Sequence, residues 1–177
     1  MEDQLAFNAR AVFTWRSDRL YRVHLSGNEL FFIRLGGQGG WREGALGGMH
    51  GQPLGLLLLP VVWLLDRWAQ KKREAKMARS DARPPQLQVR EHIHNFRLAA
   101  SDVVAASLEP PARLQLHGYH VGRWRLVTAG GQKFNFQFET LADMQWAQAI
   151  LSRVLADRLQ ISVRWDPRRG RSVRLTA

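Results

Sequence analysis

The sequence has no cysteine among its 177 residues, which excludes disulfide bridges, thiolate zinc sites and cysteine nucleophiles. It is also poor in acidic residues, since 15 Asp and Glu stand against 26 Lys and Arg, a formal net charge of +11. A surface with this charge attracts anions, whether phosphate backbones, acidic lipids or acidic proteins.

The common catalytic motifs are missing as well. There is no Gly-x-Ser-x-Gly elbow, no phosphate loop ending in Gly-Lys-Ser/Thr and no His-Glu-x-x-His. His92 and His94 lie two residues apart on a predicted strand, but a metal site needs three or four converging ligands. We therefore expect a non-enzymatic protein without catalytic residues, bound metal or cofactor.

The N-terminus does not resemble an export signal. Glu2 and Asp3 stand where such a signal requires positive charge, so a cytoplasmic location is expected. The composition, with 45% hydrophobic and 23% charged residues, is that of a globular protein. The length fits one domain that carries an insertion or a tail.

Alternating apolar and polar residues predict a mainly antiparallel β protein. Residues 20–25 alternate in this way and the turn residues Ser26-Gly27-Asn28 follow, so we expect a β-hairpin over residues 20–35. Phe32 interrupts the polar side of the second strand, and residues 6–19 fit either a helix or a strand. The apolar residues expected on one face of the hairpin are Tyr21, Val23, Leu25, Phe31, Ile33 and Leu35.

Further elements are predicted in the second half of the chain. Thr140 begins a helix that extends to about Asp157, because Asp143 three residues later completes a capping box. Residues 158–177 read as a basic hairpin or tail, and residues 80–85, with two prolines, read as a linker. The other predicted strands are 92–98, 103–108, 113–117, 121–128 and 132–138.

Seven strands followed by one amphipathic helix is the element order of pleckstrin-homology (PH)-like domains. With the segments GNELFFIRLGGQ and GGQKFNFQFET, this order makes the chain resemble bacterial PH-like and GRAM-like domains. The resemblance implies an α+β, mainly β fold: a seven-stranded antiparallel barrel capped by the C-terminal helix, with a helical insertion after strand 2. Residues 1–35 and 92–157 would form the barrel and its helix, and residues 36–91 the insertion. The resemblance also implies a scaffold for lipid or protein contact.

The first part of the insertion is rich in glycine at a spacing of four. On a helix such residues share one face and allow close backbone contact, which predicts self-association in a homo-oligomer. A flexible loop is the alternative, because glycine costs a helix about 1 kcal/mol relative to alanine. The two series are Gly36, Gly40, Gly44 and Gly48, and Gly47, Gly51 and Gly55.

An apolar run followed by a basic run predicts a peripheral membrane element in the same insertion. Residues 44–65 carry no formal charge and at about 33 Å would just span a bilayer, but the strongly apolar run is only residues 54–65. That length favours an interfacial or re-entrant helix over a span. Indole rings favour the headgroup region, and basic residues gain about 1 kcal/mol each beside acidic lipid. The alternative is that the apolar run packs on the barrel. The predicted membrane-binding residues are Leu56, Leu57, Leu58, Leu59, Trp63, Trp68, Lys71, Lys72, Arg73 and Lys76.

The arginine-rich C-terminus supports an alternative function. Arginines that follow a phosphate backbone, with one tryptophan to stack on a base, predict a soluble nucleic-acid-binding module. The residues concerned are Arg168, Arg169, Arg171, Arg174 and Trp165. The main prediction is a cytoplasmic module, peripheral at the inner face of the cell membrane, whose partner is an acidic membrane surface or a protein.

Overall fold

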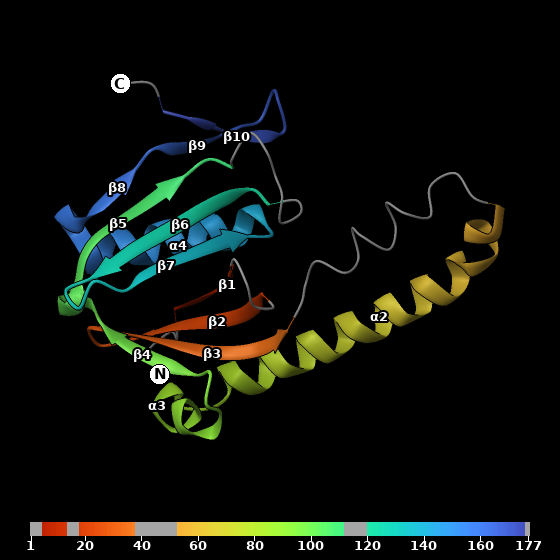
Figure 1. Ribbon diagram of the computed structural model, residues 1–177, viewed down its shortest axis with the longest axis horizontal. Coiled ribbons are helices and arrows are strands. Elements are labelled where there is room, and N and C mark those ends of the chain that lie inside the picture. Colours follow the sequence, from red (N-terminus) through yellow and green to blue (C-terminus); the bar gives the residue numbers. More distant parts are fainter. Residues whose placement is uncertain (1–4, 14–17, 38–52, 112–119, 176–177) are drawn as a thin grey trace.

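The computed structural model describes residues 5–13, 18–37, 53–111 and 120–175, and for residues 37 and 53–66 it describes the backbone. The described strands form an eight-stranded sheet with the order β4-β3-β2-β1-β7-β6-β5-β8 and a separate two-stranded hairpin (Figure 1). The strands of the sheet are β1 (Ala6–Ala11), β2 (Arg19–Ser26), β3 (Glu29–Gly37), β4 (Phe96–Ala99), β5 (Val103–Glu109), β6 (Gly122–Thr128), β7 (Lys133–Phe138) and β8 (Leu159–Ile161).

The sheet is open, so the predicted closed barrel of seven strands is wrong. β8 follows the C-terminal helix and pairs in parallel with β5, from Ala106 opposite Leu159 to Leu108 opposite Ile161. This additional strand occupies the edge of β5 on which a barrel would close. At the other edge β4 pairs with β3 alone in the part of the chain that the structure describes.

The open sheet is nevertheless strongly curved, and the core lies on its concave side. Phe32 of β3 stacks on Trp124 of β6, with ring centroids 5.9 Å apart, although three strands separate them in the sheet. Phe136 of β7 lies between them, 5.4 Å from Phe32 and 4.8 Å from Trp124. All three rings are fully buried.

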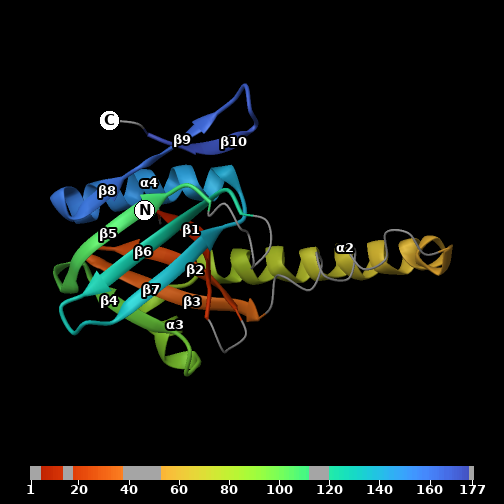
Figure 2. The same cartoon turned by 45° about the horizontal axis from the view of Figure 1, so that its top comes forward.

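Helix α4 (Leu141–Leu155) completes this core, as its apolar spacing predicts (Figure 2). Thr140 is its N-cap, and the Thr140 hydroxyl accepts a hydrogen bond of 3.1 Å from the backbone amide of Asp143. This confirms the predicted Thr140 cap, whereas the Asp143 carboxylate accepts from the Thr140 hydroxyl and from the Asn8 backbone amide. The residues of α4 that are buried against the sheet are Met144, Ala147, Ile150, Leu151 and Leu155.

The hairpin of β2 and β3 forms as predicted. However, the prediction that the apolar side chains of its two strands lie on one face is wrong. Ser26 pairs with Glu29, so the turn has only two residues, and Gly27 takes a φ of +59° that favours glycine. This register places Phe32 opposite Val23 in the core and Phe31 opposite His24 on the convex side. A shift of one residue in the register exchanges the two faces of a strand. Since β3 is apolar on both faces, its alternation does not define the register, and the length of the turn does.

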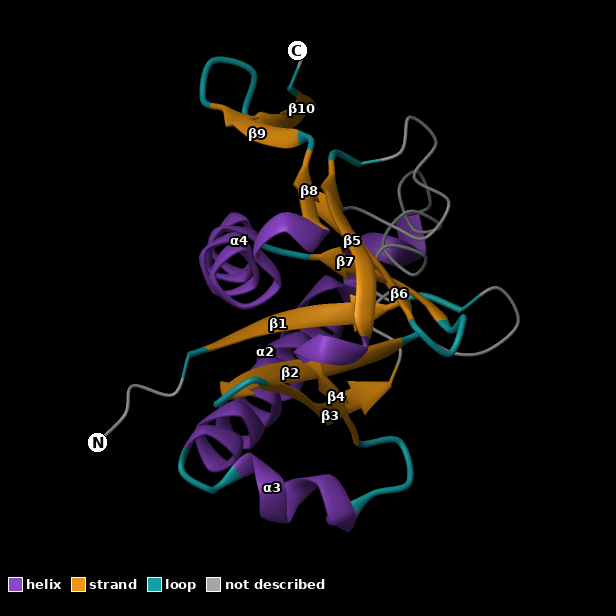
Figure 3. Ribbon diagram, turned by 90° about the vertical axis from the view of Figure 1, so that its left-hand side faces the viewer, coloured by secondary structure: helices purple, strands orange, loops and turns teal. Residues whose placement is uncertain are grey.

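The insertion covers the convex side, which explains why β3 is apolar on both faces. Its helices are α2 (Pro53–Asp81) and α3 (Pro85–Gln88), followed by the 3-10 turn η1 (Val89–Glu91). The second half of α2 and α3 lie beside β2 and β3, where Phe31, Ile33 and Leu35 are buried (Figure 3). The first half of α2 projects beyond the sheet (Figure 1).

The glycine series lies mostly outside the described residues. Gly36 is a residue of strand β3 and pairs with Leu20, so it does not belong to a helical groove as predicted. Its backbone is needed for sheet pairing at this position. Gly55 lies in α2. Gly40, Gly44, Gly47, Gly48 and Gly51 fall outside the described residues.

The remaining strand predictions divide into three outcomes. The strands predicted at residues 103–108, 121–128 and 132–138 are confirmed. The strand predicted at residues 92–98 begins only at Phe96, because a turn in which the Asn95 amide donates to the His92 carbonyl comes first. Residues 113–117 lie outside the described part of the chain. The C-terminal hairpin is present as β9 (Val163–Asp166) and β10 (Arg171–Arg174).

Candidate functional site

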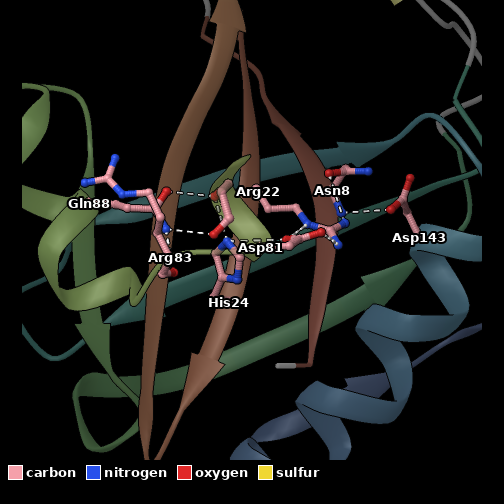
Figure 4. A network of polar contacts seen from close by, with 8 residues as sticks. Asn8, Arg22, His24, Asp81, Arg83, Gln88 and Asp143 are labelled. Carbon is pink, nitrogen blue, oxygen red and sulfur yellow. Dashed lines mark hydrogen bonds and ion pairs between the residues drawn. The ribbon is translucent and has the colours of Figure 1, made fainter. Parts of the chain in front are cut away.

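The end of α2 is held on the convex side of the sheet by a network of polar contacts (Figure 4). The Arg22 guanidinium on β2 donates two hydrogen bonds to the Asp81 carboxylate, Nε to Oδ1 and Nη2 to Oδ2, both of 2.9 Å. Two residues further along β2, His24 Nε2 lies 2.9 Å from Ser80 Oγ. Two adjacent contacts therefore fix the last turn of α2 on one strand.

The hydrogen bonds assign the proton on His24. Ser80 Oγ donates to Gln88 Oε1 at 2.9 Å, so the hydroxyl accepts from the Nε2–H group of His24. Burial lowers the pKa of His24 from 6.5 to about 4, although the nearby Asp81 carboxylate opposes this effect. At neutral pH this histidine is therefore uncharged.

The corner between α2 and α3 is packed and is not the free linker predicted for residues 80–85. The Gln88 side-chain amide donates to the carbonyls of Ser80 and Arg83, each at 2.8 Å. Ser80 and Gln88 are both buried. The first bond satisfies a carbonyl group in the last turn of α2, which a helix leaves without an intrahelical partner, and the second fixes the chain just after the helix.

The network continues through β1 to α4 on the other side of the sheet. Arg22 Nη1 donates to Asn8 Oδ1 at 3.3 Å, and the Asn8 backbone amide donates to Asp143 Oδ1 at 2.8 Å. Asp143 is the residue that also bonds the Thr140 cap of α4. One chain of contacts thus connects the end of α2 to the beginning of α4.

Ser80, His24 and Asp81 do not have the geometry of a catalytic relay. In such a relay the carboxylate faces one ring nitrogen and the hydroxyl faces the other. Here Asp81 Oδ1 lies 3.9 Å from Nε2, the nitrogen that already faces Ser80, and His24 is completely buried. We interpret this cluster as a device that positions α2.

Of the predicted basic residues on α2, one faces the sheet and three face solvent. Arg73 is half-buried, and its Nη1 lies 3.9 Å from Glu139 Oε2 next to the end of β7. Lys71, Lys72 and Lys76 are exposed. Trp68 is 58% exposed, and Lys72 Nζ lies 3.5 Å from the centroid of one of its rings, a cation–π contact.

The predicted apolar anchors Leu56, Leu57, Leu58, Leu59 and Trp63 belong to the projecting half of α2, and their side chains are outside the description. Their helical backbone agrees with the sequence prediction. Within the described residues, no helix has an apolar stretch long enough to cross a bilayer.

The C-terminal hairpin presents its arginines to solvent but not its tryptophan. Trp165 is partly buried and packs against the core. Burial lowers the pKa of Arg123 on β6, and the positive charges of Arg125 on the same strand and of Arg174 lower it further. Sequence analysis missed the two arginines of β6. The exposed arginines of the hairpin are Arg164, Arg168, Arg169, Arg171 and Arg174.

Sequence analysis also missed the residues that position α2. Arg22 and His24 alternate with apolar residues on β2, and this alternation alone predicts a strand without a role for either side chain. The signal that identifies them is the two-residue turn, which places His24 beside the apolar Phe31 and Arg22 beside Ile33. When polar and apolar side chains on one strand face are buried together, the element that covers them must supply hydrogen-bond partners.

Comparison of the chain with protein-family models and with curated proteins gives no match. The resemblance to PH-like and GRAM-like domains therefore stays a prediction.

Proposed function

We propose that the protein is a non-enzymatic module that binds acidic membrane surfaces through α2. The observation that carries this proposal is the position of one continuous helix of 29 residues. Its basic half is fixed to the sheet, and the half with the apolar sequence projects beyond the sheet (Figure 2). A projecting apolar helix in water is unfavourable unless another apolar phase receives it.

The order of residues along α2 suits the layers of a membrane interface. The apolar run 54–65 is about 18 Å long at 1.5 Å per residue, which suits insertion among headgroups and upper acyl chains but not a crossing. Trp68 follows, with Lys72 against its ring, at the level where indoles and cations favour headgroups. The proposed location is the inner face of the cell membrane.

The experiment is co-sedimentation with vesicles of phosphatidylcholine alone or mixed with phosphatidylglycerol. The Trp68→Ser variant should bind both kinds of vesicle several-fold more weakly, because the contribution of the indole is burial and not Coulomb attraction. Trp146→Ser is the matched control, since Trp146 on α4 is 54% exposed and far from α2 in sequence. It should bind like the wild type.

Two outcomes would contradict the proposal. A wild-type protein that binds neither kind of vesicle refutes membrane binding. Equal losses for Trp68→Ser and Trp146→Ser remove the special role of α2. Retention on single-stranded DNA with a steep salt dependence, lost on substitution of Arg168 and Arg169, would favour the nucleic-acid alternative.

A further inference from the structure

A hollow of about 440 Å³ lies between the basic half of α2 and the end of strand β3. Leu35 on β3 forms its apolar floor and is 4% exposed. Ala75 adds a small side chain, which keeps the hollow open. The full lining is Leu35, Lys72, Arg73, Ala75, Lys76 and Arg79.

Four of these six lining residues are cations, and none is acidic. Among the described residues no carboxylate lies within ion-pair distance of Lys72, Lys76 or Arg79. Arg73 has Glu139 at 3.9 Å, but that carboxylate also faces Arg10 at 3.7 Å. The hollow therefore carries an excess of positive charge that the described protein does not neutralise.

The pKa of Lys76 is consistent with this excess of positive charge. Lys76 is an exposed residue, but partial desolvation of its ammonium group lowers its pKa, and the positive charge of Arg34 on β3 lowers it further. An anion bound beside these groups would reverse the second effect. Phosphate is the anion best suited to several cations at once, because its oxygens accept from lysine ammonium groups and from the planar fork of arginine.

We propose that this hollow binds the phosphate group of an acidic phospholipid. The proposal rests on the proposed function, since it requires α2 to lie at a membrane. Lys72, which lines the hollow, also contacts the exposed Trp68 ring, so the hollow lies next to the ring that would occupy the headgroup region. A lipid phosphate would then meet Lys76 and Arg79 while its acyl chains stay in the bilayer beside the apolar half of α2.

The test compares vesicles of equal negative surface charge, in which phosphatidylcholine is mixed with either phosphatidic acid or oleic acid. A headgroup site should make the wild type bind the phosphatidic acid vesicles at least about fivefold more tightly than the carboxylate vesicles. Lys76→Gln should lose most of this preference, and so should Arg79→Gln. Lys71→Gln is the matched control, because Lys71 is exposed on the same helix but does not line the hollow. It should keep the preference.

The outcomes separate the two proposals. If wild type binds both vesicles equally, or if Lys71→Gln and Lys76→Gln lower the preference for phosphatidic acid alike, the phosphate site is wrong while membrane binding stands. If wild type binds neither vesicle, both proposals fail. Inorganic phosphate titrated by calorimetry without vesicles gives the last arm: saturation at micromolar concentration would assign the hollow to free phosphate and overturn the lipid assignment. Unchanged thermal unfolding of each variant confirms that the fold is intact.

Discussion

The two sides of the sheet are covered by different chemistry. On the concave side α4 buries only apolar residues against an aromatic core. On the convex side α2 and α3 bury His24, Ser80 and Gln88 and close them with hydrogen bonds. Apolar burial is strong but not directional, whereas a polar network accepts one geometry. The concave side therefore supplies most of the stability, and the convex side fixes where α2 points.

The largest effect should come from a charge placed on the concave side. Leu151 on α4 is completely buried, so Leu151→Asp should destabilise the fold by about 5 kcal/mol or more, comparable to the whole stability of many domains. Loss of the cooperative transition in thermal unfolding would be the result. Ser152→Asp, at the exposed neighbouring position, should cost less than about 1 kcal/mol. A cooperatively folded Leu151→Asp protein would show that α4 is not part of the core.

Acid should weaken the convex side next. The pKa of His24 is about 4 in the folded protein and about 6.5 in an unfolded chain, so the unfolded state takes up the proton first as the pH falls. The contribution of neutral His24 to the free energy of unfolding is complete above pH 6.5. It is lost as the pH falls towards 4, by up to about 3 kcal/mol. Urea unfolding between pH 7.5 and 4 measures it.

A His24→Gln variant provides the control for this pH dependence. It should be less stable at pH 7.5 and should lack the part of the slope between pH 6.5 and 4 that His24 contributes. The carboxylates of the protein titrate in both proteins and cancel in the difference. Parallel curves for the two proteins would mean that His24 can take up a proton without loss of stability.

The strands and α4 could be predicted because their signals are local. The alternation at residues 132–138 and the Thr140 cap with Asp143 each lie within a few residues of sequence. The open sheet could not be predicted in this way, because it depends on β8 pairing with β5 across some fifty residues. A parallel pair of this kind is not marked by a turn between its strands.

The candidate site divides in the same way. The apolar run and the basic run that follows it are local, so the sequence identified α2 and Lys72, Arg73 and Lys76. Leu35 lines the hollow only because α2 returns along β3. That course depends on contacts such as Arg22 with Asp81, 59 residues apart. Polar residues that anchor a helix look like solvated residues until their partners are known.

A smaller loss of stability is expected from the partly exposed Arg22–Asp81 pair on the convex side. Asp81→Asn removes the charge that Arg22 faces and should cost about 1–2 kcal/mol. The loss should also raise hydrogen exchange in the second half of α2 while leaving α4 protected, because only one side of the sheet loosens. Glu74→Gln, an exposed carboxylate on the same helix, is the control and should change neither quantity. Equal exchange in α2 for the Asn variant and the wild type would contradict the positioning role of the network.

The smallest loss of stability should come from a polar contact on the convex side that is exposed rather than buried. Arg83 and Glu91 form an ion pair there, but their side chains are 43% and 48% exposed. Exposed pairs contribute about 0–1 kcal/mol, because water and salt screen them and two long side chains lose freedom. Arg83→Gln should therefore lower the free energy of unfolding by less than about 0.5 kcal/mol, and high salt should reduce even that difference. Urea unfolding at low and high salt measures both quantities. If Arg83→Gln instead matched Asp81→Asn, the corner between α2 and α3 would depend on exposed charge as much as on the buried bonds of Ser80 and Gln88, and the contrast between the two sides of the sheet would need a different explanation.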